Sequence, residues 1–349
     1  MTSPRTGKIQ TVLGLIEPSE LGVTLSHEHL VFDFSPNFVE PEEPELKALA
    51  RAPISLSNLG WLQYNWRSSL DNMTFLDQKA ASEEVSRFAK AGGRSIVDTT
   101  SIGIGRDPGA LVYISKATGV NIVMGAGYYV AGSHPKDMSK RSEDQITREI
   151  VADVTKGVGA TGVRAGIIGE IGCSWPWEAN ERKAVRAAGR AQSETGAALA
   201  IHPGRSEEAP FQIIDELKSV GADISRTVMC HVCRTMYNRD KLLRLAETGI
   251  VLEWDLFGHE DTHYPFNEAP TPSDLQRIEQ IKWVLDHGFE DQVLISHDIC
   301  TKQRLARYGG HGFTHLTKYV TLRMERVGIT EGQIDKMIQQ TPRRVLAFA

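Results

Sequence analysis

Short apolar runs rich in β-branched residues alternate with longer amphipathic stretches along most of the chain. Such runs are typical of buried strands, and apolar residues recurring every three or four positions are typical of helices. The apolar runs predict eight strands, at residues 23–30, 95–100, 121–129, 165–172, 197–202, 227–232, 250–255 and 293–298. The amphipathic stretches predict helices at residues 82–91, 108–118, 143–156, 181–195, 211–220, 240–248, 272–287 and 314–327.

Eightfold alternation of strand and helix favours either an open doubly wound sheet or a closed (β/α)8 TIM barrel. The number of strands fits the barrel, and the absence of a GxGxxG after the first strand disfavours a dinucleotide-binding sheet. We therefore predict a single α/β domain over residues 1–349. Two segments exceed the minimal barrel: a short N-terminal β-hairpin within residues 6–22, and an insertion at residues 34–78 that is long enough to cover the active-site face.

Composition narrows the class of protein further. The chain has 349 residues, of which 41% are hydrophobic and 24% charged, as in soluble globular proteins. Its net charge of -5 and the lack of a Lys/Arg cluster argue against nucleic acid as a partner. No run of about 18 apolar residues predicts a membrane span, and no signal peptide is evident. Four cysteines are too few for a disulfide scaffold, so we expect a cytoplasmic protein.

Two of the cysteines, Cys230 and Cys233, have the CxxC spacing of some zinc and redox sites. They lie in residues 226–233, a run that we interpret as a strand. Residues three apart on a strand point to opposite faces. We therefore favour a structural interpretation, in which one cysteine packs on the barrel exterior and the other lies near the following loop.

Histidines and carboxylates fall at the ends of different predicted strands. In strand one, the i, i+2 spacing of His27 and His29 turns both imidazoles inward and Glu28 away. Four further residues end strands four, five, six and eight: Glu170, His202, His231 and Asp298.

Closure of a barrel would bring these six side chains together at its carboxyl end, where barrel enzymes place their sites. A single strand-end histidine is more often a hydrogen-bonded structural residue than a ligand. A buried cluster of four imidazoles and two carboxylates would stay uncompensated without a cation. This donor set favours Zn2+, Mn2+, Fe2+ or Co2+ over Ca2+ or Mg2+.

Motifs along almost the whole chain are similar to those of the phosphotriesterase family of the amidohydrolase superfamily. They are residues 7–15 (GKIQTVLGL), 25–29 (LSHEH), 166–176 (GIIGEIGCSWP), 201–206 (IHPGRS), 296–299 (SHDI) and 308–312 (YGGHG). The resemblance implies a centre of two divalent metal ions, with zinc the leading candidate. It assigns His27, His29 and Asp298 to the buried ion, and His202 and His231 to the exposed one. Glu170 takes the bridging place of the carboxylated lysine found in many relatives.

The resemblance also implies a mechanism. Water that bridges the ions would attack a carbonyl or phosphoryl centre as hydroxide, and Asp298 would orient it and take its proton. In several members an aspartate after the strand-six histidine and a histidine near the end of strand seven relay this proton outward. Here Cys233 and Asp255 stand in those neighbourhoods, so His259 or His263 could substitute.

The family hydrolyses organophosphates, lactones and amides on one kind of site, so the substrate depends on the loops. Resemblance to one branch implies cleavage of N-acetyltaurine and related N-acyl amino compounds to acetate and taurine. A sulfonate needs a cation, and an arginine offers a fixed fork of donors. The candidates for this contact are Arg205, Arg234, Lys302 and Arg304, and the candidates for the pocket wall are Tyr128, Tyr129, Asn65 and Trp66.

Two other functions stay open from the sequence. One is a lactonase or phosphotriesterase that acts on a less polar substrate. The other is a metal-binding module without turnover, although loss of a ligand would be its usual trace and all six residues are present. The resemblance also favours a homodimer.

Overall fold

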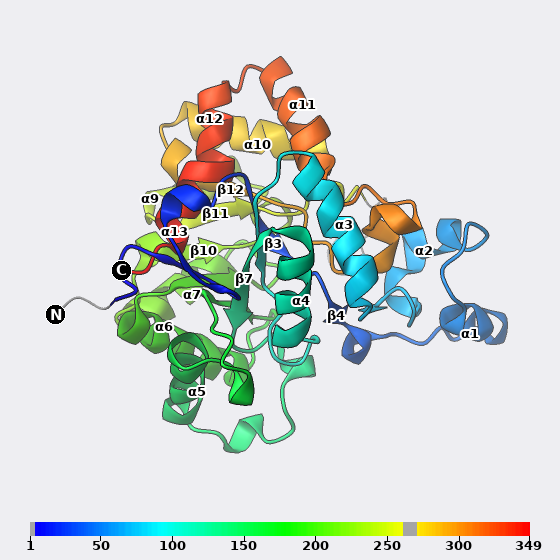
Figure 1. Ribbon diagram of the computed structural model, residues 1–349, viewed down its shortest axis with the longest axis horizontal. Coiled ribbons are helices and arrows are strands. Elements are labelled where there is room, and N and C mark those ends of the chain that lie inside the picture. Colours follow the sequence, from blue (N-terminus) through cyan, green and yellow to red (C-terminus); the bar gives the residue numbers. More distant parts are fainter. Residues whose placement is uncertain (1–3, 261–270) are drawn as a thin grey trace.

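The computed structural model describes residues 4–260 and 271–349, and within them eight parallel strands form one sheet. Neighbouring strands follow the order β3 (Thr24–Glu28), β6 (Ser95–Asp98), β7 (Asn121–Ala126), β8 (Ile167–Gly172), β9 (Ala198–His202), β10 (Thr227–Met229), β11 (Val251–Trp254) and β12 (Val293–Ile295). The sheet curls until its two edges meet, because the Asp298 N–H donates to the His27 carbonyl at 3.1 Å. The predicted TIM barrel is confirmed (Figure 1).

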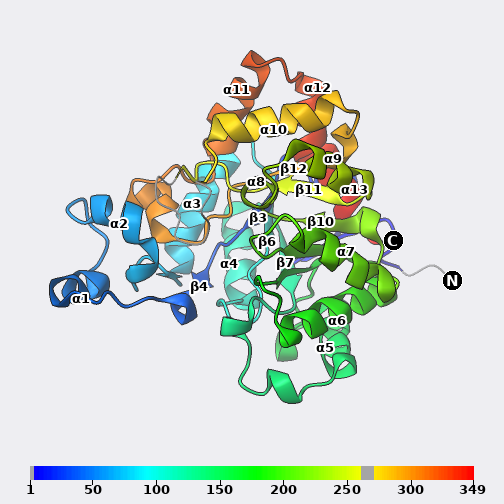
Figure 2. The ribbon, with the colours of Figure 1, turned by 180° about the vertical axis from the view of Figure 1, so that it is seen from behind.

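Helices surround the barrel in the predicted order (Figures 1 and 2). They are α3 (Gln78–Lys90), α4 (Pro108–Thr118), α5 (Glu143–Thr155), α6 (Ala179–Thr195), α7 (Ala209–Ser219), α9 (Arg239–Glu247), α10 (Asp274–Asp286) and α11 (Thr321–Arg326). The local sequence fixes where several of these helices begin. Asp77 and Asp107 cap α3 and α4, and Ser142 and Ser273 form capping boxes on α5 and α10. Residues Leu316–Val320, ahead of α11, form a π-helical turn.

The amino end of the barrel is closed by both ends of the chain. The predicted hairpin pairs β1 (Ile9–Thr11) with β2 (Gly14–Ile16), and α12 (Glu331–Asp335) and α13 (Thr341–Leu346) complete the chain. Inside the barrel, apolar side chains of successive strands pack against Ile9, Leu21 and Leu346. This packing of the described residues fills the amino end of the barrel.

The insertion after the first strand projects from the barrel on the side away from both termini (Figures 1 and 2). Its base is a short antiparallel pair of β4 (Phe32–Asp33) and β5 (Thr74–Phe75). Between these strands lie α1 (Pro44–Arg51) and α2 (Leu59–Asn65). Trp66 follows α2 and reaches the cavity described below.

The interpretation of residues 226–233 as a continuous strand is wrong. Strand β10 ends at Met229, His231 has a left-handed φ of 55°, and α8 (Val232–Thr235) begins directly after it. Strand alternation therefore does not extend across the CxxC. Cys230 packs with the apolar residues inside the barrel, not on its exterior, while Cys233 lies in the outer core on α8. Both are free thiols.

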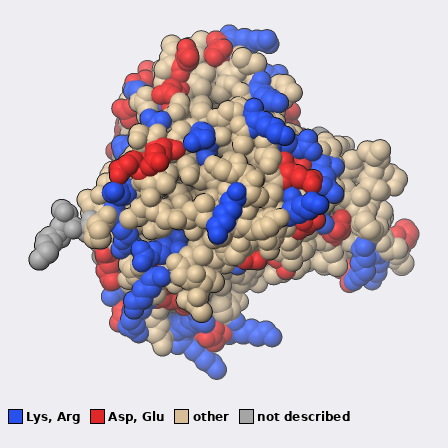
Figure 3. All heavy atoms as spheres, in the orientation of Figure 1, with Lys and Arg blue, Asp and Glu red and all other residues tan. Residues whose placement is uncertain are grey.

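Lysine and arginine side chains are interspersed with aspartate and glutamate over the face seen in Figure 3. None of the helices in the described ranges is both long and apolar enough to cross a membrane.

Glu28 turns away from the barrel interior, as strand alternation predicts, and holds the closing edge of the sheet together. Its buried carboxylate accepts hydrogen bonds from the Ser296 hydroxyl at 2.8 Å and from the backbone N–H groups of His297 and Ile299 at 3.1 and 3.0 Å. His297 Nδ1 lies 2.7 Å from the same carboxylate. These bonds fix the backbone on both sides of Asp298.

We predict that Glu28→Gln lowers the free energy of unfolding by about 2 kcal/mol, because several charge-assisted hydrogen bonds to a buried carboxylate are weakened at once. Urea unfolding followed by circular dichroism measures this change. Glu279→Gln, at an exposed position on α10, is the matched control and should stay within about 0.5 kcal/mol of wild type. Equal stability of the two variants would contradict the role given to Glu28.

Candidate metal centre

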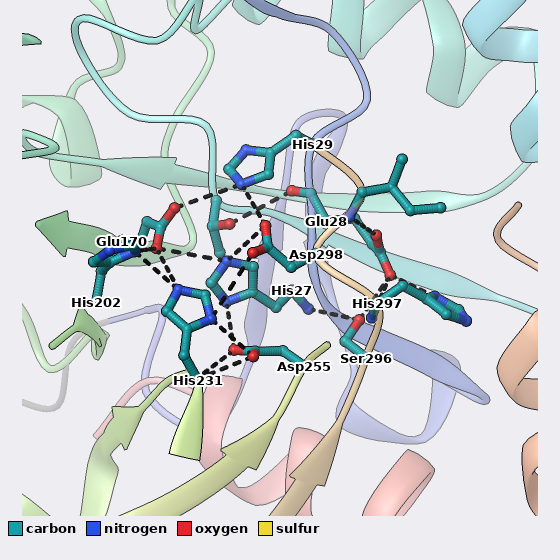
Figure 4. Close-up of polar contacts among 12 residues, drawn as sticks. His27, Glu28, His29, Glu170, His202, His231, Asp255, Ser296, His297 and Asp298 are labelled. Atoms are coloured by element: carbon teal, nitrogen blue, oxygen red, sulfur yellow. Dashed lines mark hydrogen bonds and ion pairs between the residues drawn. The ribbon is translucent and has the colours of Figure 1, made fainter. Parts of the chain in front are cut away.

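The six residues singled out from the sequence meet at the carboxyl end of the barrel (Figure 4). His27 lies in β3 and His29 directly after it, and both turn Nε2 toward Asp298. The distances to Asp298 Oδ1 are 3.1 Å from His29 and 3.8 Å from His27. The expectation that the i, i+2 spacing sends both imidazoles inward matches this geometry.

Two of the six side chains are placed by unusual backbone. His231 and Asp298 have φ of 55° and 51°, and they are the positive-φ non-glycine residues of the described chain. A left-handed conformation costs a non-glycine residue about 1 kcal/mol or more, and such residues concentrate at functional sites. Strands β10 and β12 end at Met229 and Ile295, earlier than predicted. The left-handed turns that follow direct the side chains of His231 and Asp298 over the end of the barrel.

Glu170, in β8, lies between His29 on one side and His202 and His231 on the other. Its Oε2 is 2.9 Å from His202 Nδ1 and 3.3 Å from His231 Nε2, and its Oε1 is 3.5 Å from His29 Nε2. Burial alone would raise the pKa of Glu170, but the nearby His27 and His202 hold it well below its usual value. An ionised carboxylate that reaches both groups of imidazoles with different oxygens has the geometry of a bridging ligand.

Two imidazole nitrogens without hydrogen bonds indicate that the cluster is suited to bind a cation. His27 Nε2 and His29 Nε2 are buried near carboxylate oxygens but make no hydrogen bond of good geometry with them, although buried polar atoms are normally satisfied. Among the described residues, three groups present ligand atoms within 4.8 Å of one another: His27/His29/Asp298, His27/Glu170/His231 and, deeper in the barrel, His27/Cys230/Glu253/Asp255. Ligands about 2 Å from a tetrahedral ion lie about 3.3 Å apart, which matches these spacings. The residues therefore fit a divalent cation of the kind that nitrogen and oxygen ligands prefer.

The pKa of His29 also reflects the carboxylates that surround the cluster. Burial lowers the pKa of this imidazole, but the adjacent carboxylates of Asp298 and Glu170 outweigh it and raise the pKa to about 9. A proton and a metal ion would therefore compete for Nε2 of His29, since an imidazole binds a metal ion only in its neutral form.

A second layer of polar groups holds the outward nitrogen of each imidazole. Asp255 Oδ1 lies 2.8 Å from His231 Nδ1, Thr100 Oγ1 lies 2.9 Å from His29 Nδ1, and Glu253 Oε2 lies 3.2 Å from His27 Nδ1. Such partners fix the tautomer and the ring orientation of metal-binding histidines. The sequence reasoning missed the roles of Glu253 and Asp255, although their i, i+2 spacing in an otherwise apolar strand indicates two inward carboxylates.

A cavity of about 80 Å³ opens beside His202, His231 and Asp298. Its walls include Trp66, Tyr129, Arg205, Arg234, His259 and Arg304. The Arg234 side chain is buried, and its Nη2 lies 3.1 Å from His202 Nε2. Four of the proposed substrate contacts, Arg205, Arg234, Tyr129 and Trp66, therefore lie together beside the ligand set.

The structure places three other candidates away from this cavity. The Tyr128 hydroxyl donates to Glu149 at 2.5 Å on α5, because adjacent residues of an extended segment point to opposite sides. Asn65 Nδ2 donates to the Trp61 carbonyl at 3.0 Å, within α2. Lys302 Nζ lies 2.6 Å from Asp71 Oδ1. Tyr128 and Asn65 are not among the residues that line the cavity, which corrects the sequence expectation.

The family's proton relay has no direct counterpart in the described residues. Asp255 is engaged with His231, and Cys233 is buried on α8. His259 lines the cavity, and its buried Nε2 has no hydrogen-bond partner. His263, the other candidate, lies outside the described residues.

The barrel and the six candidate ligands at its carboxyl end are those of a metal-dependent hydrolase, and the comparisons with known proteins show the same class. Residues 7–346 match the model of the phosphotriesterase family, and the chain belongs to that family. It is 45% identical over 346 residues to phosphotriesterase-related protein of Nematostella vectensis, covering 98% of this chain and 99% of the relative. It is 44% identical over 344 residues to N-acetyltaurine hydrolase of Danio rerio, covering 98% of each chain.

A solved structure shares this fold over nearly the whole chain. The crystal structure of a resiniferatoxin-binding protein from Rhodobacter sphaeroides is 41% identical to this chain, with a TM-score of 0.95, and covers 99% of this chain and 97% of that chain.

We predict that Glu253→Gln weakens binding of the first metal equivalent about 10-fold to 100-fold, because the amide orients His27 less firmly and removes a buried negative charge. Titration of the metal-free protein with Zn2+ against a competing chelator measures this affinity. The control is Glu247→Gln on the exposed end of α9. Unchanged affinity in Glu253→Gln would show that His27 needs no such support.

Proposed function

We propose that the protein hydrolyses N-acetyltaurine and related N-acyl amino compounds to acetate and taurine. The observation that carries this proposal is the cavity beside the ligand set, where three arginines gather around a small space. Among the described lining residues, Asp298 is the one carboxylate, and it is assigned to a metal ion. The relatives named N-acetyltaurine hydrolase, at 41–44% identity over nearly the whole chain, support the same substrate.

Each residue of the centre has a proposed role. One divalent ion would be held by His27, His29 and Asp298. The other would be held by His202 and His231, and Glu170 would bind both ions. When bound, the ions supply Lewis acidity and lower the pKa of water toward neutrality. Asp298 lines the cavity as well as contacting His29, so its carboxylate can orient a water molecule toward the substrate and accept its proton.

The cavity walls determine which substrate fits. Arg234 is buried, and a desolvated guanidinium binds an oxyanion more strongly than an exposed one. Its contact with His202 supports a sulfonate site close to the proposed position of the exposed metal ion. Trp66 and Tyr129 wall the remaining space, whose volume of about 80 Å³ suits an acetyl group better than a long acyl chain.

Three further properties belong to the proposal. We take Zn2+ as the native metal, because histidine and carboxylate ligands suit it. The insertion would cover the active-site face, and its contribution of Trp66 to the cavity supports this. Four free cysteines support a cytoplasmic location, and the resemblance to the family supports a homodimer.

Parallel assays on N-acetyltaurine, other N-acetyl amino acids, acyl lactones and paraoxon test the substrate class. We expect the highest kcat/KM with N-acetyltaurine, since the neutral lactone and phosphotriester leave the arginines without an anionic partner. Higher kcat/KM with a lactone or with paraoxon would favour a lactonase or phosphotriesterase. Two bound metal equivalents without turnover of any of these compounds would favour a metal-binding module.

Asp298→Asn should keep much of the bound metal but lose about 100-fold to 1,000-fold in kcat, because the amide cannot accept the proton of the attacking water. Elemental analysis and steady-state kinetics on the same sample separate the two effects. Asp286→Asn, at the exposed end of α10, is the control. Near-normal turnover in Asp298→Asn would contradict the role of this carboxylate.

A further inference from the structure

We call the cavity of about 80 Å³ beside His202, His231 and Asp298 the catalytic cavity. A second cavity, of about 380 Å³, lies beside it. We call it the outer cavity. Arg304 lines both cavities, and Gly258 and Glu260, which flank the catalytic-cavity residue His259, also line the outer one. Its opposite wall comes from α2, through Gln63 and its neighbours. The two cavities therefore meet at Arg304 and at residues 258–260.

The two cavities differ in charge. The catalytic cavity has three arginines, and the carboxylate among its described lining residues belongs to the ligand set. Among its described lining residues, the outer cavity has one lysine or arginine and one carboxylate, Arg304 and Glu260. The N–H of Asp274 donates to Glu260 Oε1 at 2.8 Å, which holds this carboxylate at the start of α10. A ligand that carries both charges suits the outer cavity better than the catalytic one.

The segment that carries Arg304 is held firmly in place. A Cβ on Gly310 would lie 2.2 Å from the carbonyl carbon of Arg304, so the chain folds back on itself too closely for any side chain there. The Gly312 N–H donates to the Arg304 carbonyl at 2.8 Å. Buried Glu84 accepts the N–H groups of Ala306 and Arg307 at 3.0 and 2.9 Å. A binding group on such a segment loses little conformational entropy when a ligand binds.

We propose that the outer cavity binds the amine product of the reaction, a short zwitterion with an anionic head on Arg304 and an ammonium group on Glu260. The inference rests on the proposed function. In amide hydrolysis the C–N bond breaks and a C–O bond forms with the oxygen of water. Both hydrogens of that water end on the leaving nitrogen, so the products are a carboxylate and an ammonium ion.

This change of charge allows the protein to distinguish product from substrate. The amide nitrogen of the substrate is neutral and gains little from Glu260. The ammonium of the product is repelled by the arginines of the catalytic cavity and attracted by Glu260. Arg304 can receive the anionic head from Arg234 during this transfer, because it lines both cavities. The outer cavity would thus receive taurine on its way out.

Isothermal titration of the metal-loaded protein with taurine and with isethionate tests the inference. Isethionate has the same sulfonate but a hydroxyl in place of the ammonium. We expect Glu260→Gln to weaken taurine binding about threefold to tenfold and to leave isethionate binding unchanged. Glutamine can still accept the Asp274 N–H, so the fold should be kept, and isethionate binding reports this. The exposed Glu279→Gln is the control for a general effect of charge.

Three results would overturn the inference: no taurine binding to the wild type, equal taurine affinity in Glu260→Gln and wild type, or an equal loss of affinity for both ligands in Glu260→Gln. Binding is measured without turnover, so the outcome is independent of the proposed function. If N-acetyltaurine is hydrolysed while Glu260→Gln binds taurine normally, only the inference falls. If taurine binding depends on Glu260 but N-acetyltaurine is not hydrolysed, only the proposed substrate falls.

Discussion

The contact of one buried carboxylate with several imidazoles sets the requirements for the rest of this structure. Glu170 approaches His202, His231 and His29 at 2.9 to 3.5 Å. Burial of so many polar groups is costly unless each finds a partner. The barrel meets this cost by delivering each side chain from a different strand, and two divalent ions would complete the compensation. An encoded glutamate needs no chemical modification to offer two oxygens to two ions.

Charge is distributed in layers around this contact. Beneath the imidazoles, Glu253 and Asp255 are buried carboxylates that face the outward nitrogens of His27 and His231. Above them, Arg205, Arg234 and Arg304 line the cavity. The negative layer would support the ligands of a cationic centre, and the positive layer would attract the proposed anionic substrate. Glu28 lies outside the barrel and stabilises the loop from which Asp298 projects.

Much of this could be predicted from the sequence, because strand periodicity and strand ends are local signals. The eight strands, the hairpin and the convergence of His27, His29, Glu170, His202, His231 and Asp298 follow from them. The limits of that reasoning lie where the backbone leaves the regular pattern. His231 and Asp298 adopt left-handed conformations that end the strands early, which misled the interpretation of the CxxC.

Long-range contacts were a second limit. Gly127, with φ of 113°, interrupts the alternation just before Tyr128 and Tyr129, so the sequence could not show which tyrosine faces the cavity. The outer cavity likewise depends on segments more than 200 residues apart, such as α2 and the loop that carries Arg304.

The most direct test of the central claim is anomalous X-ray diffraction from crystals of the zinc-loaded protein, recorded above and below the zinc absorption edge. The account predicts two anomalous peaks about 3.5–4 Å apart, with one Glu170 oxygen bound to each ion. His27, His29 and Asp298 should surround one peak, and His202 and His231 the other. A single peak, or two peaks that Glu170 does not join, would contradict it.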